Sequence, residues 1–190
     1  MPQSIIDTMA VTQLPHMAFN TLAGAPVVLF TNDPEVARYT GRVVIHSGRY
    51  ASGQDMKDGY RSLKEAGWSE EDAPQVALIG YCRVKSGTTV EYDEQRFQKD
   101  RKLHGMPDMT LDAMLRRLTW EKAWGLKLQA PHWALHPVFK VRESPEEFVE
   151  DGSFWLPDQP YQYEGFKMLF KKERSLPFKK ALDVLYPAES

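Results

Sequence analysis

The stretch Gly41-Arg-Val-Val-Ile-His-Ser-Gly48 decides the fold class of this chain, because it is a β-branched run bounded by a glycine at each end. Successive side chains of a strand point to opposite faces of a sheet. Val43 and Ile45 would therefore share one face, which can be buried. Arg42 and His46 would share the other, which would offer a guanidinium and an imidazole. We predict a strand that also carries a recognition surface.

Composition indicates an ordinary globular chain of one domain. It has 190 residues, of which 42% are hydrophobic and 26% charged, with a formal net charge of -2. That charge argues against a protein held on duplex nucleic acid by bulk phosphate neutralisation, although a local basic groove is compatible with it. Cys82 is the single cysteine, so no intramolecular disulfide can form. Neither a signal peptide nor a membrane-spanning stretch is predicted, and the expected location is the cytoplasm.

Hydrophobic periodicity divides the chain into short strands and helices without a regular βαβ cadence. Strands are predicted at 25–31, 41–48, 76–84, 88–92, 123–128, 137–141 and 165–170. Helices are predicted at 14–23, 50–67, 110–120, from 144 onward and at 176–185. Residues 1–10 are expected to be a lead-in, 91–107 an exposed charged excursion and 131–137 a proline-bracketed loop. This order favours an α+β protein with a mixed or antiparallel, barrel-like sheet.

Four segments, taken in order, resemble the ASCH domains of the PUA-like superfamily. They are Gln13 to Gly24, Tyr39 to Gly48, Ala77 to Val84 and Trp120 to Leu128. ASCH domains open with a proline-containing helix that ends in glycine, followed by strands with similar motifs, and the likeness covers about residues 11–142. It implies a PUA-like (ASCH-type) mixed β-barrel of about six strands surrounded by short helices. We expect this barrel domain at 1–143, with 144–190 as a C-terminal extension packed on the same domain.

The resemblance also implies a cleft beside the opening helix that is suited to RNA or a nucleotide-like ligand. Enzymatic members of the family carry a G-x-K-x-x-E signature after this helix. Here Gly24 is followed by Ala-Pro-Val-Val-Leu, without the lysine and the glutamate. We therefore expect a binding protein that lacks this catalytic pair and needs no cofactor. Its oligomeric state is left open.

Polar groups in and after the first quoted stretch are the predicted ligand-binding residues. They are Arg42, His46, Ser47 and Arg49. A guanidinium can fork onto a phosphate or a guanine edge, and a neutral imidazole both donates and accepts. Alternatively, Arg42 is a solvated strand residue and His46 a hydrogen-bonded core histidine. A further alternative is a hydrolase or nuclease acting on RNA or a modified nucleoside, with His46 as general base.

A second predicted contact surface is the densest basic patch of the chain. It consists of Arg96, Lys99, Arg101 and Lys102. These residues could follow a phosphate backbone, with Phe97 available for stacking. The acids Asp93, Glu94 and Asp100 dilute the patch, so a solvated loop is the alternative interpretation.

Other motifs give weaker indications. His132 and His136 are four residues apart, but Pro131 and Pro137 argue against the helix that would align them, so no metal site is predicted. Cys82 lies in an apolar strand and is expected to be a buried hydrophobe. The aromatic loop 153–163 allows a third hypothesis, a protein-interaction module.

Overall fold

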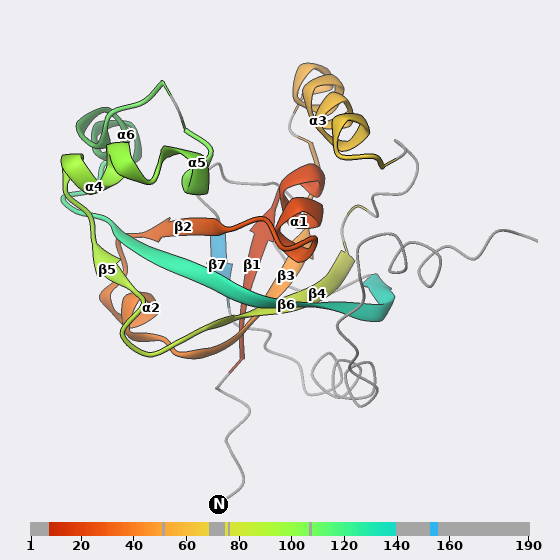
Figure 1. Cartoon of the computed structure of the whole chain (residues 1–190), viewed down its shortest axis with the longest axis horizontal. Helices are drawn as coiled ribbons and strands as arrows, with labels where there is room; N and C mark the ends of the chain where they lie inside the picture. Colours follow the sequence, from red (N-terminus) through yellow and green to blue (C-terminus); the bar gives the residue numbers. More distant parts are fainter. Residues whose placement is uncertain are drawn as a thin grey trace, which may run out of the picture.

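The computed structural model describes residues 8–50, 52–68, 75, 77–106, 108–139 and 153–155. It shows a curled mixed sheet with short helices around it (Figure 1). The strands are β1 (Thr8–Gln13), β2 (Val27–Thr31), β3 (Gly41–Ser47), β4 (Ala77–Val84), β5 (Val90–Glu91), β6 (Trp124–Phe139) and β7 (Ser153–Trp155). The helices are α1 (Pro15–Leu22), α2 (Pro34–Arg38), α3 (Gly53–Glu65), α4 (Glu94–Lys99), α5 (Arg101–His104) and α6 (Leu111–Leu118).

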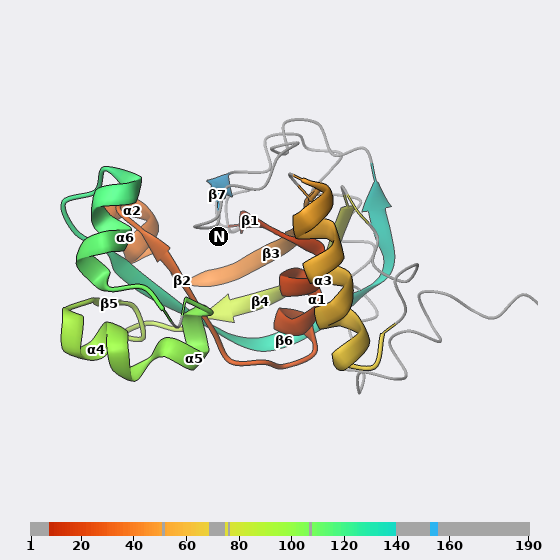
Figure 2. The same cartoon turned by 90° about the horizontal axis from the view of Figure 1, so that it is seen from above.

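The sheet runs in the order β2-β6-β4-β3-β1-β7, and β5 pairs with β6 outside this path. The pair β1–β3 is parallel and the other ladders are antiparallel. Figure 2 shows the sheet curling, with α1 and α3 beside one end and α4, α5 and α6 gathered at the other. The predicted α+β, barrel-like architecture is confirmed.

Strand β1 was not expected, because residues 1–10 were interpreted as a lead-in. It lies between β3 and β7, and its residues Met9 to Gln13 are all buried. A strand covered on both faces shows no alternation of apolar and polar side chains. Thr12 and Gln13 interrupt the apolar run as well, so periodicity could not reveal this strand.

Strand β6 is one continuous element where two strands and a proline-bracketed loop were predicted, so the loop at 131–137 is wrong. Its first half, 124–128, pairs with β2, and its second half pairs with β4 alone among the described strands. Proline is tolerated where a strand has a free side, since its missing N–H is then not needed for a ladder. Ala130, directly before Pro131, has a φ of 49°, and the β4–β6 register shifts near it.

The charged segment predicted as an irregular excursion at 91–107 contains two short helices, α4 and α5, in its described part. The Asp93 side chain accepts a hydrogen bond of 2.7 Å from the Arg96 N–H and so caps α4, and Gly105 ends α5 with a φ of 70°. Phe97 is fully buried and stacks on Phe30, so the expected stacking on a ligand is wrong. Helices this short contain too few apolar positions for their period to be read from sequence.

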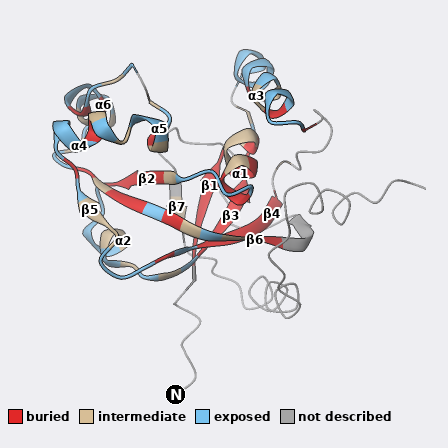
Figure 3. Cartoon of the chain, viewed as in Figure 1, coloured by how far each residue is buried: buried red, intermediate tan, exposed pale blue. Residues whose placement is uncertain are grey.

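Helix α1 packs closely on the main core, which contains residues from β1, β3, β4 and β6. Figure 3 shows the strands largely buried and the outer faces of the helices exposed. A Cβ atom on Gly80 would lie 2.7 Å from a methyl of Leu22 and would also collide with the backbone oxygen of His132. The sequence predicted a bulge or close approach at Gly80, and both are present, because the β4 register shifts between Leu78 and Gly80.

Several predictions fall on residues outside the described ranges. They are the helix from 144, the strand at 165–170 and the helix at 176–185. Within the predicted extension 144–190 the structure describes Ser153–Trp155, which pairs with β1 in the same sheet. None of the described helices has the length and apolar character needed to cross a membrane.

Replacing Gly80 with alanine should lower the free energy of unfolding by about 1–3 kcal/mol or more, because the backbone oxygen of His132 cannot rotate away from the new methyl group. Urea denaturation of both proteins measures the change. Gly53→Ala is the matched control, since nothing lies within 4 Å of the added atom at the start of α3. Equal losses in the two variants would contradict the close packing of α1 at Gly80.

Candidate functional site

The parallel ladder between β1 and β3 sorts the polar side chains of this region onto two faces. Its register pairs Val11 with Ile45, then Thr12 with His46, then Gln13 with Ser47. Val11 and Ile45 belong to the core cluster that contains the α1 residues Ala18, Phe19 and Leu22. Because side chains alternate, Gln13 and Ser47 lie on this same α1 face, and Thr12 and His46 point to the opposite face.

His46 is fully buried on the face opposite to α1. Its Nδ1 lies 3.1 Å from the Thr12 hydroxyl oxygen in a hydrogen bond between the two strands. Burial lowers the pKa of His46 to about 4, so the ring is neutral at neutral pH. This is the environment of a core histidine that helps to join two strands. The predicted roles of His46 as ligand and general base stay predictions.

The other three predicted ligand residues do not gather around His46. Arg42 is exposed, and its guanidinium carbon lies 4.9 Å from the centroid of the Tyr81 ring, as in a cation–π contact. Arg49 is exposed in the segment after β3. Ser47 is buried beside Gln13 on the α1 face, so the structure separates it from Arg42 and His46.

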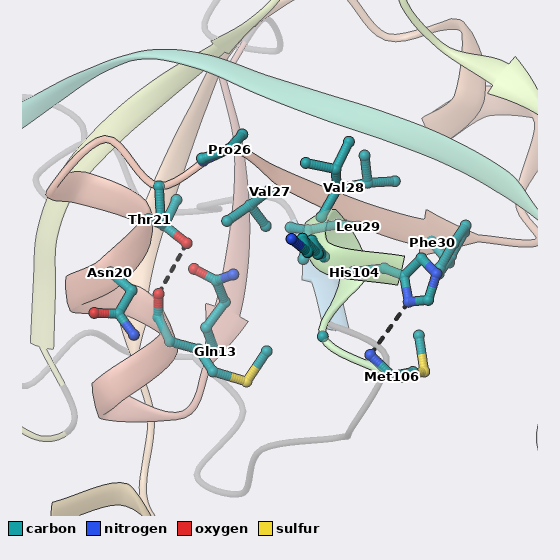
Figure 4. Close-up of a pocket in the computed structure, with 15 residues that line it drawn as sticks. Gln13, Asn20, Thr21, Pro26, Val27, Val28, Leu29, Phe30, His104 and Met106 are labelled. Atoms are coloured by element: carbon teal, nitrogen blue, oxygen red, sulfur yellow. Dashed lines mark hydrogen bonds between the residues drawn. The ribbon is translucent and has the colours of Figure 1, made fainter. Parts of the chain in front are cut away.

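A cavity of about 200 Å³ lies between α1, β2 and the end of α5. Its lining comprises Gln13, Met17, Asn20, Thr21, Ala25–Phe30 and Lys102–Met106. We call this cavity the cleft. It lies beside the opening helix, and its other walls are β2 and the end of α5. None of the predicted ligand residues Arg42, His46, Ser47 and Arg49 lines it. The side chains around it are drawn in Figure 4.

Gln13 reaches the cleft from the end of β1, between α1 and β2 (Figure 4). Its side chain is fully buried, and neither its amide oxygen nor its amide nitrogen has a hydrogen-bond partner among the described residues. The backbone is held separately, since the Gly48 N–H donates to the Gln13 carbonyl oxygen at 2.8 Å. A buried amide without partners is costly, and the one acceptor and two donors of this amide are unused by the described residues.

The opposite wall of the cleft is built by His104 and the residues around it. The His104 Nε2 lies 2.9 Å from the Phe97 carbonyl oxygen, which can only accept, so Nε2 donates. Its Nδ1 accepts from the Met106 N–H at 3.2 Å. Both ring nitrogens are therefore used in hydrogen bonds within the protein, and the His104 ring shapes the wall. Lys102, exposed beside it, provides the cation of the lining.

The wall that follows Gly24 is apolar. Pro26 and Leu29 occupy the places where the G-x-K-x-x-E signature would put its lysine and glutamate, and both line the cleft. Neither side chain can transfer a proton. Among the residues that the structure describes, no three His, Cys, Asp or Glu side chains gather as metal ligands either.

Comparison with solved structures identifies the fold. The crystal structure of the ASCH protein from Zymomonas mobilis matches with a TM-score of 0.51, covering 86% of this chain and 95% of that one at 13% identity. Two crystal structures of single-residue mutants of the same protein match with TM-scores of 0.52 and 0.53 at 13% identity, covering 86% and 88% of this chain and 98% and 99% of those chains. The chain has the ASCH fold. No family model and no curated protein sequence matches it.

Within this ASCH fold, the sequence singled out the cleft residue Lys102, as a nucleic-acid contact, and did not single out Gln13, which also lines the cleft. Gln13 was missed, because its strand gave no signal and a single glutamine carries no motif. The quoted order Gln13-Leu-Pro15 could have indicated it only if the strand before the helix had been recognised.

The lowered pKa of His46 predicts an acid-dependent loss of stability. Between pH 6.5, the ordinary pKa of histidine, and about 4, the unfolded chain binds a proton at His46 that the folded chain does not bind. Stability is therefore full above this window and falls as the pH drops through it. From pH 7 to pH 4.5 the expected loss is about 2 kcal/mol.

His46→Asn removes this titration and keeps a polar side chain for Thr12. The free energy of unfolding, measured with urea at both pH values, should fall by about 2 kcal/mol less in the variant than in the wild type. The pKa of His16, also lowered by burial, contributes equally to both proteins and cancels. The same pH dependence in both would show that His46 titrates normally in the folded chain.

Proposed function

We propose that the chain binds the base of RNA or of a nucleotide-like ligand in the cleft. The observation that carries this proposal is the buried Gln13 amide, which lines the cleft and has no hydrogen-bond partner among the described residues. A glutamine amide can form two hydrogen bonds at once with a base edge, as it does with adenine in nucleic-acid complexes. A ligand base in the cleft would supply the hydrogen-bond partners that the Gln13 amide lacks within the described protein.

The other walls of the cleft suit a flat, largely apolar ring. Met17, Val27 and Leu29 contribute apolar side chains, and Lys102 lies where a cation could contact a phosphate outside. The cavity, at about 200 Å³, is smaller than the roughly 300–1,000 Å³ of sites for drug-sized molecules. We therefore expect it to hold one base, with the sugar and phosphate outside.

The ASCH fold supports this function as an analogy and does not carry it alone, since one fold hosts many functions. The hydrolase alternative lacks comparable support, because His46 lies buried on the face away from the cleft. The interaction-module alternative concerns residues 153–163, of which 156–163 lie outside the described ranges. The cytoplasmic location stays a prediction.

Replacing Gln13 with leucine should weaken nucleotide binding by at least about tenfold, equivalent to about 1.4 kcal/mol. Titration of each of the four ribonucleoside monophosphates, followed by calorimetry, measures the change. The same variant should unfold no more easily than the wild type, or be more stable by about 1 kcal/mol, because leucine removes a buried amide without partners. If Gln13 had a purely structural role, the leucine variant would instead bind nucleotides as the wild type does and would unfold more easily.

Gln54→Leu is the matched control, since Gln54 is exposed on α3 and bonds Asp58 there. It should bind nucleotides as the wild type does. Two results would overturn the proposal: a wild-type protein that binds none of the monophosphates at millimolar concentration, and a Gln13→Leu variant that binds them unchanged.

A further inference from the structure

Two further depressions of the surface lie along the segment that contains α4 and α5. A second depression, lined by 98–103 and Gly105, shares Lys102, Leu103 and Gly105 with the cleft. A third, lined by Asp93, Gln95, Arg96, Lys99 and Asp100, shares Lys99 and Asp100 with the second. The three depressions therefore follow one another along α5 and α4, each sharing lining residues with the next. We call the second and third together the basic groove.

Exposed cations follow the whole length of the basic groove. Arg96, Lys99, Arg101 and Lys102 are all exposed and line it. Arg101 donates from Nε to the neutral Gln98 side chain at 2.6 Å. Within the described part of the chain, Lys99, Arg101 and Lys102 have no carboxylate within ion-pair distance. Three positive charges are therefore available to an anionic ligand.

The acids that dilute this segment in sequence form hydrogen bonds with groups of the protein itself, although Asp93 and Glu94 are exposed. The carboxylate of Asp93 caps α4. One oxygen of Glu94 accepts from the Leu111 N–H at the start of α6, at 2.8 Å. Asp100 accepts from the Tyr92 hydroxyl at 2.8 Å and lies 3.9 Å from Arg96. Helix starts carry partial positive charge, which offsets part of the negative charge of the first two carboxylates.

We propose that the basic groove binds the sugar–phosphate backbone of a single-stranded nucleic acid, one base of which enters the cleft. The inference rests on the proposed function of the cleft and extends it from a single nucleotide to a strand. A strand is favoured over a duplex for two reasons. The proposed cleft takes an unpaired base, and a net charge of -2 argues against binding to a duplex by bulk phosphate neutralisation.

The groove should bind its strand without reading sequence. Phe97 is fully buried between Phe30 and His104 and offers no ring for stacking. Contact then depends on phosphates, so affinity should fall steeply with salt. Base preference would come from the cleft, through Gln13.

Fluorescence anisotropy with a labelled single-stranded RNA of about eight nucleotides, within the range that single-strand binders occupy, tests the groove. We expect it to bind at least about tenfold tighter than the monophosphates at low salt. The double variant Lys99→Ala/Arg101→Ala should bind this RNA about tenfold more weakly. Its slope of log affinity against log salt should be shallower by about 1.4, the value for two lost phosphate contacts. Its affinity for monophosphates should not change.

Lys57→Ala/Lys64→Ala, which removes two exposed cations of α3, is the matched control and should leave RNA binding unchanged. The groove is overturned if the oligonucleotide binds no tighter than a monophosphate, if the Lys99/Arg101 variant keeps its affinity, or if polyphosphate or duplex RNA competes equally well. These results leave the cleft intact. A different outcome separates the two proposals. If RNA binding is lost in the Lys99/Arg101 variant but unchanged by Gln13→Leu, the proposed role of the groove is supported and the proposed role of the cleft is overturned.

Discussion

The close approach of α1 to the sheet is the constraint on which the rest of this structure depends. It is set at Gly80, where the absence of a side chain lets Leu22 reach the β4 backbone and the neighbouring β6 backbone come near as well. Only glycine leaves this space. Since α1 follows β1 directly and precedes β2, its depth fixes both the position of Gln13 and the distance across the cleft. A packing contact thus sets the geometry of the candidate site.

Two buried polar side chains on neighbouring strands, those of His46 and Gln13, differ in their hydrogen bonding to the protein. His46 faces Thr12 and bonds it, so its polarity contributes to the joint between β1 and β3. The side chain of Gln13, one residue after Thr12, lines the cleft and has no hydrogen-bond partner among the described residues. Selection for stability alone would favour an apolar residue at Gln13, because unsatisfied buried amides destabilise. A polar group kept at such a cost is the kind of feature that marks a binding site.

The sequence allowed much of the fold to be predicted and little of the site. Strands β2, β3 and β4 and helices α1, α3 and α6 have strong periods or clear terminating glycines, and their order also indicated the ASCH resemblance. Strand β1 is buried on both faces, β6 crosses two prolines, and α4 and α5 are too short for a period. The site residues could not be predicted for a topological reason. Alternation of side chains puts His46 and Arg42 on one face of β3, but only the position of α1 shows which face of the sheet borders the cleft.

The strands β1 and β3 pair in a parallel ladder, and the chain between them forms α1, β2 and α2. Two walls of the cleft, α1 and β2, are therefore part of one crossover connection. The ladder must close before these walls can face each other, so the cleft cannot form as an independent local unit. Opening of β1 away from β3 would separate these two walls and disrupt the sheet together, so the hydrogen-bonded amides of α1 and β2 should exchange with solvent mainly through large-scale unfolding.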